Sequence, residues 1–199
     1  MKVGIISIGD EILSGYTINT NASWIGKKLT NIGCIIDHQI TIKDKSSSIF
    51  NALEYACSKQ IDYIILTGGL GPTDDDLTRE TLFKFVSADS VFDKDYWELL
   101  KTNYKKKTGL NIPKGNKNQA LIPSKGKIIP NSFGTARGFQ FNVKNILVIS
   151  LPGVPFEMKK MMNELVLPQI QNSLKKLKYT KTIKTYGLPE TKLAEKISK

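Results

Sequence analysis

Three glycines and three aspartates that could take part in ligand binding or catalysis lie together in residues 67–78, TGGLGPTDDDLT. Glycine lets a backbone approach a ligand closely and adopt positive φ angles. Asp74, Asp75 and Asp76 follow at once, and three adjacent carboxylates repel one another. Backbone donors beside carboxylates favour a phosphate group held next to a divalent cation. Two structural alternatives stay open: a tight turn for the glycines, and capping of the following helix by an aspartate.

Two more polar loops each follow a predicted buried strand. Asp10 and Glu11 come after the apolar residues 3–8, and residues 152–155, PGVP, come after the apolar residues 146–151. If these strands are parallel to the strand before residue 67, all three loops meet at the carboxyl edge of one sheet, where open α/β folds bind ligands. A magnesium-type cation needs only one or two protein carboxylates there, and it lowers the pKa of a bound water.

Other kinds of site are disfavoured by what the sequence lacks. Cys34 and Cys57 are the two cysteines and have no metal-ligand spacing, and His38 is the single histidine, which argues against a Cys/His zinc site or a histidine-based nucleophile. The P-loop pattern G-x-x-x-x-G-K-[ST] is absent, and Asp74 stands where the dinucleotide fingerprint has its final glycine. A P-loop or nicotinamide-dependent enzyme is therefore not expected.

The net charge of +11 does not predict nucleic-acid binding. Only Arg79 and Arg137 are arginines among the 29 basic residues, and proteins that read nucleic acids depend on the planar arginine fork. The chain has 199 residues, no apolar run near the roughly 18 that a membrane span needs, and no signal-peptide pattern. We expect a cytoplasmic protein without nucleic-acid or membrane partners.

The elements that must position these loops alternate along the chain. Apolar spacing predicts helices over 20–32, with Asn19 or Thr20 as N-cap, over 46–57, 77–86 and 96–104, and after 155, where Met158, Met161, Met162 and Leu165 share one face. Strands are predicted over 3–8, 34–42, 62–66 and 146–151, and irregular strands and loops over 109–141. This alternation predicts βαβ units and a mostly parallel sheet.

Six motifs together resemble the amino-terminal domain of the CinA (competence/damage-inducible) family, which has the fold of the molybdopterin-binding MoaB and MogA proteins. They are GDE at 9–11, NTNA at 19–22, GGLGPTDDDLT at 68–78, GNKNQA at 115–120, GTA at 134–136 and LPGVPFEM at 151–158. The resemblance covers residues 2 to about 170.

The resemblance implies an α/β fold, a three-layer α/β/α sandwich with a mostly parallel sheet, over residues 1–172. Residues 173–199 are expected to be a linker and the truncated start of a second small domain. Family members are often dimers or trimers. Their amino-terminal domain is associated with divalent-metal-dependent hydrolysis of ADP-ribose. The nicotinamide mononucleotide amidase domain of full-length members is not in these residues.

Site residues follow from the resemblance by position. The implied diphosphate-holding residues are Gly68, Gly69, Leu70, Gly71, Pro72 and Thr73. The implied catalytic residues are Asp75 and Asp76, and the implied ligands of a magnesium, manganese or cobalt ion are Asp10, Glu11, Asp75 and Asp76. The implied remaining substrate contacts are Asn21, Asn116, Gln119, Pro152 and Gly153.

Two residues depart from the family pattern: Asn19 stands where aspartate is common, and Arg137 stands where proline is usual. We predict that Arg137 reaches a substrate phosphate. The sequence as a whole predicts a metal-dependent nucleotide pyrophosphatase in which an aspartate among residues 74–76 orients the attacking water. The alternatives are a non-catalytic molybdopterin or nucleotide-binding module and a molybdopterin adenylyl transferase. The expected partners are a nucleotide diphosphate or a pterin, and a second copy of the chain.

Overall fold

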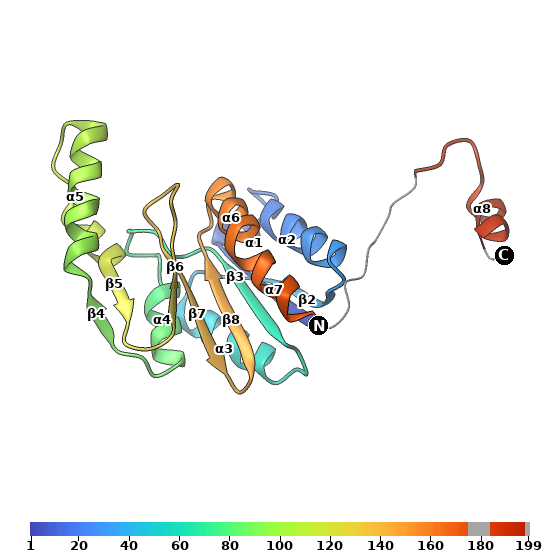
Figure 1. The fold of residues 1–199 in the computed structure, drawn as a ribbon, viewed down its shortest axis with the longest axis horizontal. Coiled ribbons are helices and arrows are strands. Elements are labelled where there is room, and N and C mark those ends of the chain that lie inside the picture. Colours follow the sequence, from blue (N-terminus) through green and yellow to red (C-terminus); the bar gives the residue numbers. More distant parts are fainter. Residues whose placement is uncertain (175–183, 198–199) are drawn as a thin grey trace.

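The computed structural model describes residues 1–174 and 184–197, and its centre is a six-stranded sheet in the order β2-β1-β3-β8-β7-β6 (Figure 1). The strands are β1 (Lys2–Ile8), β2 (Ile35–Ile42), β3 (Tyr63–Thr67), β6 (Lys127–Ile129), β7 (Gly138–Val143) and β8 (Ile146–Leu151). β2, β1, β3 and β8 are mutually parallel, and β7 is antiparallel to both of its neighbours, β8 and β6. The predicted mostly parallel sheet is confirmed.

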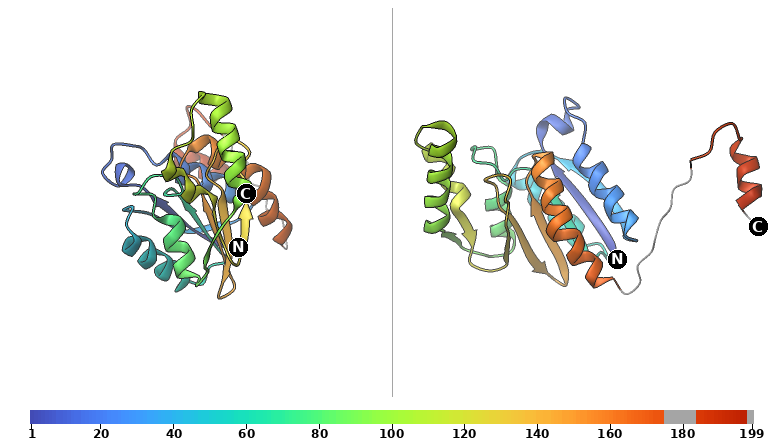
Figure 2. Two further views of the ribbon diagram at one scale, coloured as in Figure 1. Left: turned by 90° about the vertical axis from the view of Figure 1, so that its left-hand side faces the viewer. Right: turned by 45° about the horizontal axis from the view of Figure 1, so that its top comes forward.

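Helices cover both faces of this sheet, which gives the predicted three layers (Figures 1 and 2). One face carries α2 (Thr20–Asn31), α6 (Pro155–Met161) and α7 (Leu167–Ser173), and the other carries α3 (Ser46–Cys57) and α4 (Thr78–Phe85). Alternate residues of a strand point to opposite faces. Ile5 and Ile65 therefore pack with the first group of helices, while Ile6 packs with the second.

Local sequence explains where several elements begin and end. The Asn19 side chain accepts a hydrogen bond from the Ala22 amide at 3.0 Å, so Asn19 is the N-cap of α2. α3 begins at Ser46, and no side chain caps it, although Ser46 to Ser48 in the sequence could have supplied a cap. At the β7–β8 hairpin, Lys144 and Asn145 both have positive φ, as a two-residue turn between twisted strands requires.

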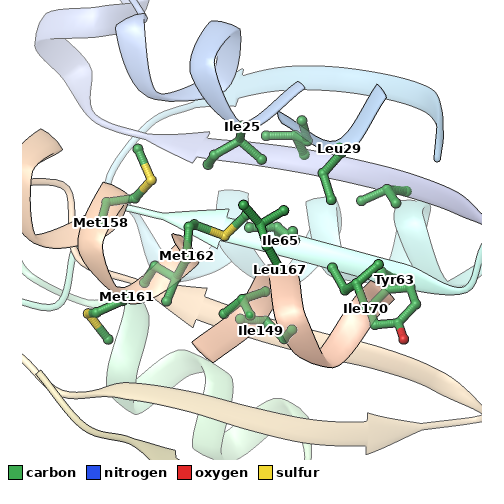
Figure 3. Packing of buried hydrophobic residues seen from close by; sticks show 14 of the residues in the cluster. Ile25, Leu29, Tyr63, Ile65, Ile149, Met158, Met161, Met162, Leu167 and Ile170 are labelled. Atoms are coloured by element: carbon green, nitrogen blue, oxygen red, sulfur yellow. The ribbon is translucent and has the colours of Figure 1, made fainter. Parts of the chain in front are cut away.

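Methionines fill the core under α6 and α7 (Figure 3). Met158, Met161 and Met162 are fully buried against Ile149 and its neighbours, as their spacing predicts. Leu165 is 39% exposed, so its predicted place on the core face is wrong. The wider π-helical turn η2 (Met162–Val166) shifts the periodicity, and Val166 is buried in its place.

A small unit stands beside the sandwich (Figure 1). It consists of the antiparallel pair β4 (Ser90–Phe92) and β5 (Leu121–Pro123), the helix α5 (Lys94–Thr108) and the 3₁₀ helix η1 (Lys114–Ala120). The remaining helices are α1 (Asp10–Leu13) and α8 (Glu190–Ile197). None of the helices in the described ranges is long and apolar enough to cross a membrane.

Candidate functional site

The carboxyl edge of the parallel sheet gathers the loops that the sequence singles out. β1, β3 and β8 are neighbours and parallel, so Asp10, the 68–76 loop and Pro152 all follow strand ends on this edge. The predicted convergence of the three loops is confirmed. β2 is parallel to β1, and its end therefore brings a fourth loop, with Asp44, to the same edge.

The glycine loop depends on two residues with positive φ. Gly68 has φ 114°, and a Cβ there would overlap the backbone oxygen of Ile8. Gly69 has φ 65°, and a Cβ there would overlap the Thr78 hydroxyl. The Gly68 amide donates to the Leu151 carbonyl at 3.1 Å, which ties the loop to the end of β8. Only glycine fits this path, because the loop crosses directly over β1 and the start of α4.

Asp76 closes the glycine loop from within. Its Oδ1 accepts from the Gly71 amide at 2.9 Å, and its Oδ2 accepts from the Thr73 amide at 3.0 Å and from the Thr73 hydroxyl. Both oxygens are thus bonded inside the loop, and the carboxylate lies where backbone donors favour an anion. Asp75 is fully exposed, and the Thr73 side chain lowers its pKa.

Asp44 is a functional candidate that the sequence analysis missed. Its Oδ1 and the buried Thr78 hydroxyl have no hydrogen-bond partner among the described residues, and the backbone of Gly69 passes close to both. Burial raises the pKa of Asp44 from 3.8 to about 6, and the charges of Asp76, Asp75 and Asp10 add to this, although the Leu77 amide opposes it. The sequence could have indicated Asp44 as a site residue, because it closely follows the predicted strand 34–42.

A pocket of about 340 Å³ lies between the glycine loop and the loop after β8. The predicted residues that line it are Gly69, Leu70, Gly71, Pro72, Asp76, Gln119, Pro152 and Gly153. Two hydrogen bonds hold the Gln119 side-chain amide. Its oxygen accepts from the Asn116 side-chain amide at 3.2 Å, and its nitrogen donates to the Thr135 hydroxyl at 2.8 Å. Asn116 therefore supports the wall without lining it.

Glu157 also lines this pocket and was not predicted as a site residue. Its Oε2 accepts from the Asn131 amide at 2.6 Å, and Gly134 lies so close to the carboxylate that a Cβ there would overlap it. The two segments that meet here contain the GTA and LPGVPFEM motifs. Glu157 belongs to the LPGVPFEM motif, and this position in the sequence could have indicated it as a site residue.

Some predicted residues lie beside the pocket and do not line it. Asp10 and Glu11 line a neighbouring hollow with Lys43. Asn21 is buried and donates to Thr67 Oγ1 at 3.1 Å and to the Gly153 carbonyl at 2.8 Å, so both of its amide hydrogens hold the loops together. In the residues that the structure describes, no three Asp, Glu, His or Cys side chains form a cluster that could hold a metal ion.

The two arginines are both buried. Arg79 donates to the Leu70 carbonyl at 2.6 Å and so stabilises the glycine loop. Burial lowers the pKa of Arg79 to about 10. Arg137 donates to Asp93 Oδ2 at 2.6 Å, stacks on the Tyr96 ring at 3.6 Å and lies outside the lining of the glycine-loop pocket. The structure therefore does not bring Arg137 to the pocket that contains the predicted diphosphate residues.

The chain is an α/β domain with a glycine-rich loop at the carboxyl edge of a mostly parallel sheet, and its fold is that of the proteins MoaB and MogA. MoaB of Thermus thermophilus superimposes with a TM-score of 0.58 over 86% of this chain and 92% of that chain, at 21% identity. A MogA structure gives a TM-score of 0.55 over 87% and 99%, at 19% identity. Likeness at this level shows the fold alone.

More similar relatives show the family. Residues 4–172 match the family described as "Probable molybdopterin binding domain". CinA from Thermoplasma acidophilum is 34% identical, with a TM-score of 0.73 over 85% of this chain and 97% of that chain. A CinA-like protein of Flavobacterium psychrophilum is 39% identical over 202 residues, which cover 99% of this chain and 47% of that protein. The chain belongs to the CinA-like members of this family, and it spans about half the length of the curated relatives that it matches.

Proposed function

We propose that this domain is a divalent-metal-dependent nucleotide pyrophosphatase that acts on ADP-ribose or a related nucleotide diphosphate. One observation carries the proposal: the buried, unpartnered Oδ1 of Asp44 lies beside the glycine loop within electrostatic range of Asp10, Asp75 and Asp76. Such a concentration of carboxylates favours a bound cation.

The donor set suits a hard divalent cation such as magnesium, manganese or cobalt. Carboxylate oxygens are suitable ligands, and a magnesium-type ion takes one or two of them and completes its shell with water and substrate phosphates. Asp44 and Asp75 are the carboxylates that we expect to hold it, with Asp10 contributing charge nearby. When bound, the cation supplies charge neutralisation for the diphosphate.

The chain's own residues have separate roles in this proposal. The pocket between Gly69 and Gly153 takes the diphosphate, and Gln119 contacts the nucleotide beside it. Asp76 holds the loop in shape through its bonds to Gly71 and Thr73. Exposed Asp75 orients the attacking water. These residues lower the barrier chiefly by positioning the reacting groups.

The second candidate is a binding module that holds a pterin or nucleotide without cleaving it. The observation that favours it is that Asp76, a predicted catalytic residue, has both oxygens bonded within its own loop. Family membership and fold agree with this reading as well as with hydrolysis, because one fold serves several chemistries. A molybdopterin adenylyl transferase would use the same pocket to transfer an adenylyl group to molybdopterin, in place of hydrolysis.

Incubation with ADP-ribose and each of the three cations separates these readings. The pyrophosphatase releases AMP and ribose 5-phosphate, and we expect no release after chelation. Asp75→Ala should lower turnover with the cation present. Its ADP-ribose affinity measured in chelator should stay within about threefold of the original protein, because the Asp75 side chain is exposed. Tight binding of a pterin or of ADP-ribose without any AMP release would refute hydrolysis and favour the binding module.

A further inference from the structure

We propose that a second cleft, between α5 and residues 128–137, binds a phosphate group carried on a flat apolar ring. The cleft has a volume of about 730 Å³. Its walls come from two segments that are distant in sequence, α5 on one side and the chain between β6 and β7 on the other. This size is within the range of small-molecule sites in proteins.

Arg137 provides an anion-binding group at the base of the cleft. It is 7% exposed, and Nη1 donates to Asp93. Its Nε and Nη2 are buried and have no hydrogen-bond partner among the described residues. Buried donors of a charged group are costly when they are left unpaired. Two neighbouring donors of one guanidinium match the spacing of two phosphate oxygens.

The charged residues that line the cleft are all basic. Lys106 and Lys107, on the last turn of α5, line it together with Arg137, and no carboxylate is among the lining residues. Asp93 neutralises Arg137 in part from outside the lining. The two lysines are exposed, so salt screens their attraction, and only an anion bound close to them feels it strongly.

Apolar side chains occupy the rest of the walls. Leu99 is 50% exposed, Phe133 41% and Ile128 37%, and all three face the same cleft. Such surfaces favour a ligand with a flat apolar part, because covering them removes apolar area from water. A nucleotide, in which ribose joins the phosphate to a flat base, would satisfy both the cations and these walls.

The cleft and the glycine-loop pocket share Thr135. Two sources of the same ligand chemistry therefore exist: the far end of a molecule bound at the glycine loop, or a separate nucleotide. The binding proposal does not depend on hydrolysis, and it needs only the unpaired donors, the lysines and the apolar walls.

The test is calorimetric titration with AMP, using paired variants of exposed lysines. Lys106→Glu should weaken AMP binding at least about tenfold, since it reverses a charge at the cleft. Lys105→Glu is the matched control: it makes the same change one residue away, outside the lining, and should alter affinity less than about threefold. Equal effects of the two variants, or no AMP binding at millimolar concentration, would overturn the proposal.

A second pair separates ligand binding from a structural role of Arg137. Arg137→Gln should weaken AMP binding about tenfold or more. Asp93→Asn still caps α5, where Asp93 accepts from the Tyr96 amide at 3.0 Å, but it no longer competes for the guanidinium as an anion. We expect Asp93→Asn to retain or tighten AMP binding. If it weakens binding as much as Arg137→Gln does, the ion pair is only structural and the proposal fails.

Titration with ADP-ribose distinguishes the two sources. If one molecule spans both pockets, Lys106→Glu and Asp76→Ala should each weaken ADP-ribose binding. If the cleft holds a separate nucleotide, AMP affinity should respond to Lys106→Glu and remain within about threefold in Asp76→Ala. Either pattern supports the cleft as a binding site, and a Lys106→Glu variant with unchanged affinity for both probes refutes it.

Discussion

Replacing Asp44 with asparagine should stabilise the metal-free protein at pH 8 and leave its stability unchanged near pH 4. Burial raises the pKa of Asp44 from 3.8 to about 6. The folded state therefore binds the Asp44 proton more tightly than the unfolded state, and this carboxyl lowers the free energy of unfolding as the pH rises from about 4 to about 6. At pH 4 the group is protonated in the folded state and only about half ionised in the unfolded state, so the substitution changes stability little there.

The size of the effect follows from the same pKa. A change from 3.8 to about 6 corresponds to at most about 3 kcal/mol, at about 1.4 kcal/mol per pH unit. Asp44 is only half buried, so screening by water should reduce the gain from Asp44→Asn to about 1 to 2 kcal/mol at pH 8. Asp74→Asn is the control, because Asp74 is an exposed carboxylate of the adjacent loop and should change stability by less than about 0.5 kcal/mol.

Urea denaturation in the presence of a chelator, at pH 4, 6 and 8, measures these free energies. In a second series, magnesium replaces the chelator. At a concentration tenfold its dissociation constant, magnesium should raise the stability of the original protein at pH 8 by about 1.4 kcal/mol, and it should raise that of Asp44→Asn by less. Loss of stability in Asp44→Asn at pH 8 without metal, or an equal gain at pH 4 and pH 8, would show that the reasoning about buried charge is wrong.

Three further predictions concern the loops and the core. Asp76→Ala should lower the free energy of unfolding by about 2 kcal/mol, because it removes the charged acceptor of the loop amides. Asp75→Ala should change it by less than about 0.5 kcal/mol, and urea denaturation of both variants measures the difference. Asn21→Ala should cost about 1 to 3 kcal/mol by the same assay, because two hydrogen bonds between α2 and the sheet edge are lost, and unchanged stability would exclude that role. Met162→Ala should lower stability by about 2 to 5 kcal/mol and Leu165→Ala by less than about 1 kcal/mol in thermal unfolding; the reverse order would contradict the π-helical register.

Much of the sandwich could be predicted because its signals are local. Apolar β-branched runs such as residues 3–8 specify buried strands, and Asn19 followed by apolar residues at helical spacing specifies the start of α2. Parallel strands must end at one edge, so the meeting of Asp10, the 68–76 loop and Pro152 followed from the order of elements. The register of α6 to α7 did not follow, because Pro168 lacks an amide hydrogen and the turn before it widens.

Within the candidate site, the predicted backbone conformation of the glycine loop is confirmed. Gly68 and Gly69 adopt the positive φ angles that their side-chain-free backbone allows. The partner that a side chain contacts in the folded protein could not be predicted from the sequence. Arg137 pairs with Asp93, forty-four residues earlier in the chain, and no spacing in the sequence indicates that contact.

The sequence by itself determined the alternation of strands and helices and the edge of the sheet at which the polar loops meet, because hydrophobic periodicity and glycine content act over a few residues. The family followed from the resemblance of its six motifs. Tertiary structure alone decided which charges are buried and what each of them contacts. It placed Asp44 beside Gly69, and it directed both oxygens of Asp76 into their own loop. It also put Arg137 in a separate cleft. The physical reason is that burial and hydrogen bonding depend on atoms brought together from distant segments, and these set the cost and use of a charge.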